Sequence, residues 1–284
     1  MSLPPTPAIL LRRIEHGDYD LILTFLTPNR GKIAVMAKSA KKSKKRFAGT
    51  LEPFAVLEIV YSGPGRRRGL PILQEASLVH PFTAIRGNVL KTAYASYWAQ
   101  LITEWTEQDI KEPSLFELYT YALAEMDRGE QLPDTLSVLF QIRFLDLAGL
   151  APSLDGCLVC ETSIDDTGER RIYFDLARGG VLCAACRPSD PSTPAGGDMP
   201  HRDLVREPRE AYPGAGSDRP EPHFLSLGTI KPLLWMQHND LKTAGRVRFT
   251  PRAAAESLAI LEAFVPYHLG KDPRSLKFLQ QIRK

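Results

Sequence analysis

Residues 20–38 read DLILTFLTPNRGKIAVMAK, and their pattern predicts two β-strands joined by a turn. The run DLILTFL is rich in β-branched and aromatic residues, and the run KIAVMAK alternates, so that its apolar side chains share one face. Between the two runs, Pro28 presets φ and Gly31 can take a positive φ, which is typical of a turn.

Three further runs of the same kind flank this hairpin. They are AILLRRI at 8–14, FAVLEIVY at 54–61 and LPILQEASLV at 70–79, the last preceded by the turn GPGRRRG at 63–69. Short antiparallel strands at such even spacing suit a small barrel, because closure of the sheet leaves no exposed edge. We therefore predict a five-stranded barrel of the oligonucleotide/oligosaccharide-binding (OB) type, with an SH3-like barrel as the alternative.

A strongly basic stretch, residues 38–46, lies between two of these strands, and no Asp or Glu occurs from Leu21 to Leu51. One interpretation is a solvated, flexible loop. The other is a surface for nucleic-acid phosphates, to which Ser39 and Ser43 could donate hydrogen bonds. The candidate phosphate contacts in the stretch and near it are Lys38, Lys41, Lys42, Lys44, Lys45, Arg46, Arg12, Arg13, Arg30, Lys32, Arg66 and Arg67.

The distribution of charge favours the second interpretation. The whole chain of 284 residues has a formal net charge of only +3, but residues 1–80 carry 13 Lys and Arg against 6 Asp and Glu. The rest of the chain is slightly acidic. A local positive field of this kind attracts polyanions and lets a protein follow a phosphate backbone.

Residues 83–149 have a helical pattern, with an apolar stripe that runs from Ile85 to Trp105. The aromatic residues in this stripe are expected in the core rather than against nucleic-acid bases. Two more helices are expected in this region, and the second closes on Gly149 as a cap. The expected helices downstream of the stripe lie at 114–127, 135–148, 227–238 and 252–264.

The four cysteines form two Cys-x-x-Cys pairs, Cys157 with Cys160 and Cys183 with Cys186. Two pairs at this separation match a tetrahedral four-thiolate zinc site, in which the intervening segment returns as a hairpin. We expect one structural Zn²⁺ per chain, because four thiolates leave no open coordination position. The alternatives are free thiols without metal and a redox pair.

Other patterns limit the class of protein. No apolar run approaches the ~18 residues of a membrane span, and the N-terminus does not have the order of a signal peptide, so we expect a cytoplasmic protein without a membrane partner. No catalytic motif or carboxylate cluster was found, so no enzyme activity is expected.

Together the segments resemble one family, RecO, the bacterial recombination and DNA-repair mediators. The blocks that carry the resemblance are GDYDLILTFLTPNRGKIAVMAKSAKKSKKRFAGTLEPF (17–54), YASYWAQLI (94–102), FLDLAGLAPSLDGCLVC (144–160), GGVLCAAC (179–186) and the final LKFLQQIRK. The resemblance implies an α+β chain: an N-terminal OB-type barrel, then an all-α domain with an inserted four-Cys zinc module.

The resemblance also implies a function. It implies binding of single- and double-stranded DNA, annealing of complementary strands, and work with RecR and single-strand-binding protein to load the RecA recombinase in the nucleoid. The alternative function is a zinc-stapled protein–protein adaptor with an incidental basic loop.

The chain is expected to divide into five parts. They are an OB domain at 1–80, a helical domain at 81–150, a zinc module at 151–187, a Pro/Gly-rich linker at 188–224, and C-terminal helices at 225–284 that pack with the helical domain. The length of the linker departs from the family.

Overall fold

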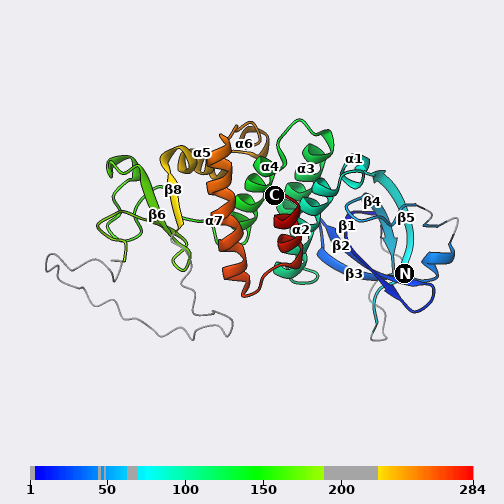
Figure 1. The fold of residues 1–284 in the computed structure, drawn as a ribbon. Helices are drawn as coiled ribbons and strands as arrows, with labels where there is room; N and C mark the ends of the chain where they lie inside the picture. Colours follow the sequence, from blue (N-terminus) through cyan, green and yellow to red (C-terminus); the bar gives the residue numbers. More distant parts are fainter. Residues whose placement is uncertain (1–3, 44–45, 48, 63–68, 189–222, 284) are drawn as a thin grey trace.

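The computed structural model describes residues 4–43, 46–47, 49–62, 69–188 and 223–283. Figure 1 shows a five-stranded sheet at one end of the molecule, helices in the middle and a small three-stranded sheet at the other end. Of the expected linker at 188–224, residues 189–222 lie outside the described part of the chain, and residues 223 and 224 begin a strand. No helix in the described ranges is long and apolar enough to cross a membrane.

The N-terminal sheet contains the five predicted strands, and every neighbouring pair in the order β3-β2-β1-β4-β5 is antiparallel. The hairpin predicted at residues 20–38 consists of β2 and β3. The two strands pair in register, from Leu21 opposite Ala37 to Thr27 opposite Gly31. The strands are β1 (Thr6–His16), β2 (Asp20–Thr27), β3 (Gly31–Ala37), β4 (Val56–Tyr61) and β5 (Leu73–His80).

The predicted barrel is not closed by a continuous ladder of hydrogen bonds. The edge strands β3 and β5 come together at a parallel bridge between Met36 and Ile72, where the Met36 amide donates to the Pro71 carbonyl at 2.8 Å. Pro71 has no N–H with which to extend the pairing. The sheet is therefore curled, with its two edges in contact at one point of the described chain.

The part of strand β1 from Ala8 to Leu11 is buried on both faces, and this part joins the sheet to the helices. Ala8 and Leu10 point into the interior of the sheet with the apolar side chains of β2 and β3. Ile9 and Leu11 belong to the core of the helical part. Since side chains alternate across a strand, one continuous apolar run serves two cores.

The central helices pack around α2, whose stripe is buried as predicted. Tyr94, Tyr97 and Trp98 are each 0% exposed, and the Trp98 ring stacks on Phe140 with centroids 5.1 Å apart. These rings are core residues. The α-helices of the chain are α1 (Thr83–Arg86), α2 (Val89–Trp105), α3 (Pro113–Arg128), α4 (Pro133–Leu147), α5 (Leu227–His238), α6 (Leu241–Ala244), α7 (Pro251–Leu269) and α8 (Arg274–Ile282).

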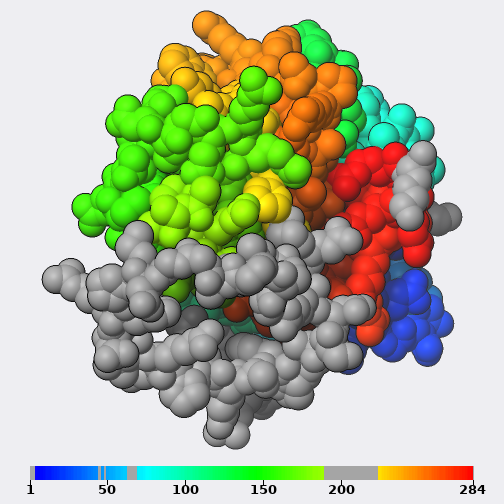
Figure 2. All heavy atoms as spheres, turned by 60° about the vertical axis from the view of Figure 1, so that its left-hand side comes forward, coloured from blue at the N-terminus to red at the C-terminus, as the bar shows by residue number. Residues whose placement is uncertain are grey.

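The small sheet holds the predicted hairpin of β6 (Arg171–Asp175) and β7 (Gly180–Leu182), with Gly179 at φ 72° in the turn. A third strand, β8 (His223–Ser226), pairs with the other side of β6. The sequence patterns did not predict β8. It returns the chain from the small sheet to α5, and Figure 2 shows this yellow segment between the green module and orange α7.

Glu256 of α7 fixes the junction of β8 and α5. One carboxylate oxygen accepts from the Ser226 amide at 3.0 Å, the Ser226 hydroxyl at 2.8 Å and the Thr229 hydroxyl at 2.6 Å. Burial acts to raise the pKa of Glu256, but hydrogen bonds from Thr229, Arg252 and Ser226 outweigh it and lower the pKa to about 2. The small sheet is thereby attached to the helices by a carboxylate that stays ionised at neutral pH.

Candidate nucleic-acid interface and metal centre

The basic stretch after β3 begins with a short 3₁₀ helix, η1 (Ala40–Lys42), that docks on the turn between β1 and β2. The Ser39 amide donates to the Asp20 carboxylate at 2.7 Å, and the Lys41 amide donates to the Tyr19 carbonyl at 3.1 Å. Both contacts use backbone groups of the stretch. Its described part is therefore held in place by the neighbouring turn and is not a free charge run.

Side chains of the stretch add to this attachment. The Lys41 ammonium lies 2.8 Å from the Glu15 carboxylate, and hydrogen bonding to Lys41 lowers the pKa of Glu15. The Lys42 ammonium lies 3.3 Å from the centre of the Tyr19 ring, as a cation–π contact. The Arg46 guanidinium donates to the Lys38 carbonyl at 3.0 Å. Lys42 and Arg46 are still exposed, and the Lys41 side chain is 27% exposed.

Arg12 and Arg13 lie on the exposed half of β1, which pairs with β2 next to this turn. The Arg13 guanidinium donates to the Leu51 carbonyl at 3.3 Å and lies 3.4 Å from the Glu52 carboxylate. It thus ties β1 to the end of the same connection between β3 and β4.

Arg30 and Lys32 lie at the opposite end of the β2–β3 hairpin and do not join the other candidates. The Arg30 guanidinium is 2.5 Å from the Asp109 carboxylate, and the Lys32 ammonium donates to the Thr103 carbonyl at 2.6 Å. Burial lowers the pKa of Lys32. The structure gives both cations partners in the helical part. Lys44, Lys45, Arg66 and Arg67 lie outside the described residues.

Tyr19 is a residue of this surface that the sequence patterns did not reveal. It is 45% exposed in the turn before β2, whereas the first aromatic residue of the basic stretch itself, Phe47, is 4% exposed. No periodicity marks a turn residue as a neighbour of η1. Only the pairing of β1, β2 and β3 brings positions 19 and 42 together.

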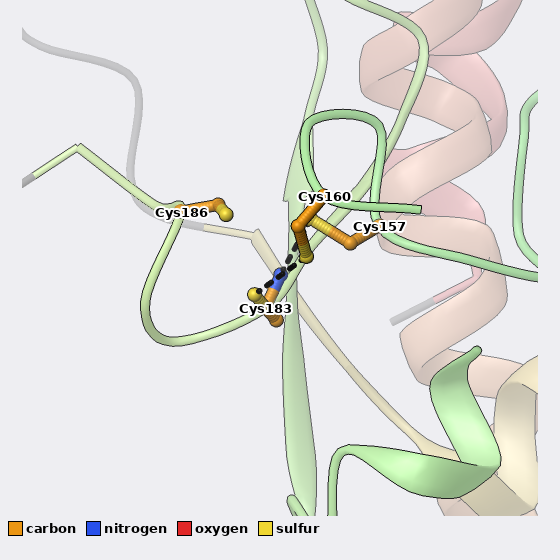
Figure 3. A group of neighbouring side chains, drawn as sticks. All are labelled: Cys157, Cys160, Cys183 and Cys186. Atoms are coloured by element: carbon orange, nitrogen blue, oxygen red, sulfur yellow. Dashed lines mark hydrogen bonds between the residues drawn. The ribbon is translucent and has the colours of Figure 1, made fainter. Parts of the chain in front are cut away.

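The four cysteines come together in the small-sheet module, as Figure 3 shows. Their sulfur atoms all lie within 4.8 Å of one another, and those of Cys160 and Cys183 are 3.7 Å apart. The Cys183 amide lies 3.5 Å from the Cys157 sulfur, which it can stabilise as a thiolate. The two predicted pairs therefore meet at one point.

The local surroundings shift the pKa values of the thiols in different directions. Hydrogen bonds from Thr162 lower the pKa of Cys160 to about 6, while burial raises the pKa of Cys186 to about 12. The fold also brings backbone close behind the cluster: a Cβ on Gly180 would lie 2.7 Å from the Ser153 carbonyl oxygen. This geometry is compatible with a bound metal ion.

The metal centre and the basic stretch lie at opposite ends of the molecule. The cysteines belong to the module that carries β6, and the basic stretch follows β3 in the N-terminal sheet (Figure 1). The helices separate the two. A metal ion in the cysteine cluster would therefore not contact a ligand held by the basic stretch.

Comparison with known proteins shows which family models the chain matches. Residues 1–82 match the family model described as Recombination protein O N terminal, and residues 86–196 and 206–277 match Recombination protein O C terminal. Together these matches cover most of the chain.

Curated relatives are similar over nearly their full length. A protein named DNA repair protein RecO from Desulfosudis oleivorans is 46% identical over 279 residues, which are 98% of this chain and 97% of the relative. Proteins of the same name from Desulfatibacillum aliphaticivorans and Syntrophus aciditrophicus are 40% identical over 99% of both chains, and 32% identical over 98% of this chain and 96% of the relative.

Proposed function

This chain belongs to the RecO family, and from that premise we propose that it is a DNA-binding recombination mediator that binds single- and double-stranded DNA and anneals complementary strands. The observation that carries the proposal is the basic stretch docked on the β1–β2 turn. Lys38, Lys42 and Arg46 are exposed there, and the backbone at Ser39 and Lys41 is hydrogen-bonded to the turn. Preplaced cations bind a polyanion without first paying the entropy of ordering a loop.

The proposed mechanism is neutralisation of two phosphate backbones. Cations that contact the phosphates of two strands reduce the repulsion between them, and release of counterions drives binding. Contacts to phosphates position a strand without reading its sequence, so little sequence preference is expected. The proposed contacts are Lys38, Lys41, Lys42, Lys44, Lys45, Arg46, Arg12, Arg13, Arg66 and Arg67. Arg30 and Lys32 are left out because they contact the helical part.

The N-terminal sheet is proposed to act as an OB-type fold. OB folds are five-stranded, partly open barrels that bind oligonucleotides with strands 2 and 3 and with the loops between strands 1 and 2 and between strands 4 and 5. The strand order and the single contact between β3 and β5 fit this description. The basic stretch would then lie beside the binding loops.

We further propose that the cysteine cluster binds one Zn²⁺. A tetrahedral ion with Zn–S bonds of about 2.3 Å separates its sulfur ligands by about 3.8 Å, close to the 3.7 Å between Cys160 and Cys183. Four thiolates leave no position for water or substrate, so the ion would staple the module and carry no chemistry. One zinc per chain by metal analysis is expected. Less than about a tenth of that amount, with four reactive thiols, would contradict it.

The decisive experiment for the proposed function is strand annealing as a function of salt. A variant with Lys38→Glu and Lys42→Glu is expected to bind and anneal more weakly and to lower the slope of log affinity against log salt by about 1.4–1.8, since each phosphate contact contributes roughly 0.7–0.9 to that slope. Lys41 is left in place because it pairs with Glu15. The matched control is Arg246→Glu with Arg248→Glu, which makes the same charge change on exposed residues that follow α6.

The same assay tests the proposed partners. RecR, single-strand-binding protein and, indirectly, RecA are proposed from the family alone. Annealing of strands coated with single-strand-binding protein, with and without RecR, is expected to keep the dependence on Lys38 and Lys42. Wild-type annealing by the double variant would refute the role of the basic stretch.

The adaptor alternative rests on a different observation. Three aromatic side chains of the C-terminal helices are about half exposed: Trp235 at 53%, Tyr267 at 51% and Phe278 at 48%. Exposed aromatic side chains are enriched at protein interfaces. If the wild-type chain shows no salt-sensitive DNA binding but captures a protein partner in a manner that depends on these residues, the adaptor function replaces the mediator function.

A further inference from the structure

The N-terminal sheet exposes a single large aromatic ring. Its Phe and Tyr residues, all of which the structure describes, are Tyr19, Phe25, Phe47, Phe54 and Tyr61. Four of them are between 0% and 6% exposed, while Tyr19 is 45% exposed. The one exposed Phe or Tyr ring of this sheet therefore lies in the β1–β2 turn, next to the basic stretch.

The Tyr19 ring is contacted by a cation and Tyr19 is partly exposed to solvent. The Lys42 ammonium lies 3.3 Å from the ring centre and covers one face. Tyr19 as a whole is 45% exposed, so part of the residue is open to solvent despite this contact. The turn itself is anchored, because the Tyr19 carbonyl accepts from the Lys41 amide at 3.1 Å and the adjacent Asp20 carboxylate accepts from the Ser39 amide at 2.7 Å.

The charges around the ring distinguish a base from a phosphate as its ligand. Asp18 is exposed beside Tyr19, and Glu15 lies across Lys41 from it. Carboxylates this near in the turn repel a phosphate more than they repel the uncharged face of a base. The cations of η1, next to the ring, are then placed for the phosphates that flank a stacked base.

We propose that Tyr19 stacks on an unpaired base and so gives the surface a preference for single-stranded over double-stranded DNA. This inference rests on the proposed function and deepens it. Bases in a duplex are already stacked and keep their faces covered, so a stacking platform contributes only to single strands and frayed ends. Base–aromatic stacking is tolerant of sequence, in agreement with an annealing protein that does not read bases.

The test compares single- and double-stranded DNA on Tyr19→Ala, Tyr19→Phe and the wild-type chain. Stacking on one base is worth about 1–3 kcal/mol by substitution, so Tyr19→Ala is expected to weaken binding of a single strand by about tenfold. Tyr19→Phe keeps the ring and is expected to stay within about twofold of the wild type. Tyr267→Ala removes an equally exposed ring from α7 and is the matched control.

Duplex affinity reports whether the basic stretch stays in place. Its two backbone contacts to the turn do not use the Tyr19 side chain, so Tyr19→Ala is expected to bind duplex DNA within about twofold of the wild type. A strand with 2-aminopurine gives a direct readout, because stacking on a ring quenches its fluorescence. Quenching is expected with the wild type and Tyr19→Phe and is expected to be lost with Tyr19→Ala.

The outcomes separate this inference from the proposed function. Equal single-strand affinity and equal quenching for Tyr19→Ala and the wild type would overturn the stacking role while leaving the phosphate contacts intact. Equal losses for single and double strands would also overturn it, since they indicate a structural role for the turn. Absence of DNA binding by the wild-type chain would overturn the proposed function itself.

Discussion

The two ends of the β2–β3 hairpin carry the same kinds of residue and use them differently. At one end, Lys41 and Lys42 are exposed around Tyr19. At the other, Arg30 and Lys32 contact residues 103–109 of the helical part. The difference teaches that basic residues on one hairpin do not form one binding face. The helical part decides which cations remain available to a ligand.

Gly31 gives the largest expected effect, because its backbone packs directly against Ile110 of the helical part. Gly31 has φ 54°, and a Cβ there would lie 1.8 Å from the Ile110 carbonyl oxygen. Gly31→Ala is expected to lower the free energy of unfolding by about 3 kcal/mol or more, since backbone must move to relieve the overlap. Urea unfolding measures the loss.

Gly17 provides the control at the exposed end of the hairpin. It has nearly the same backbone conformation, φ 57°, but nothing lies within 4 Å of a Cβ built on it. Gly17→Ala is expected to cost only the strain of the left-handed conformation, about 1 kcal/mol. Equal losses for the two variants would show that the contact with Ile110 does not matter to stability.

The salt dependence of DNA binding gives the next effect. Neutralising Lys38 and Lys42 to Gln is expected to lower the slope of log affinity against log salt by about 1.4 for single strands, since two phosphate contacts are lost. Neutralising Arg30 and Lys32 to Gln removes the same charge but is expected to leave the slope nearly unchanged, because both side chains contact protein. Equal slopes in the two variants would show that a diffuse field, and not placed cations, binds the DNA.

Much of the fold could be predicted because local patterns determined it. The five strands and helix α5 were expected from periodicity and turn residues, and Gly149 takes the positive φ expected of a helix-capping glycine. The small-sheet hairpin followed from the cysteine spacing. The features that were not predicted depend on contacts distant in sequence. Strand β8 pairs with β6 across the residues 189–222, and the edges of the N-terminal sheet are joined by a bridge between Met36 and Ile72.

The candidate sites, too, could be predicted where a local pattern determines them and could not where a distant contact does. The four cysteines were predictable because ligand spacing within each pair is local and two such pairs need each other. The roles of Arg30 and Tyr19 could not be predicted, because their partners are distant in sequence: Arg30 pairs with Asp109, and Tyr19 lies next to Lys42. A charge or a ring in a sequence does not reveal whether the fold will provide it with a partner.

The ion pair of Arg30 and Asp109 gives the smallest expected effect. The atoms are 2.5 Å apart, but the two side chains are 37% and 54% exposed. Exposed pairs contribute about 0.2–1 kcal/mol, so a double-mutant cycle of Arg30→Gln and Asp109→Asn is expected to give a coupling energy of about 0.5 kcal/mol. Asn is chosen because Asp109 has φ 62°, which Asn tolerates.

Salt decides whether this coupling is electrostatic. In 1 M salt the Debye length falls to about 3 Å, so the coupling energy is expected to shrink toward zero while the hairpin stays docked. Docking persists because the Asp109 amide donates to the Lys32 carbonyl at 3.0 Å and Gly31 still contacts Ile110. A coupling energy above about 2 kcal/mol, unchanged by salt, would mean that the ion pair and not the backbone contact holds this end of the hairpin to the helices. The cations at the two ends would then differ in the partner they meet and also in how strongly the fold depends on them.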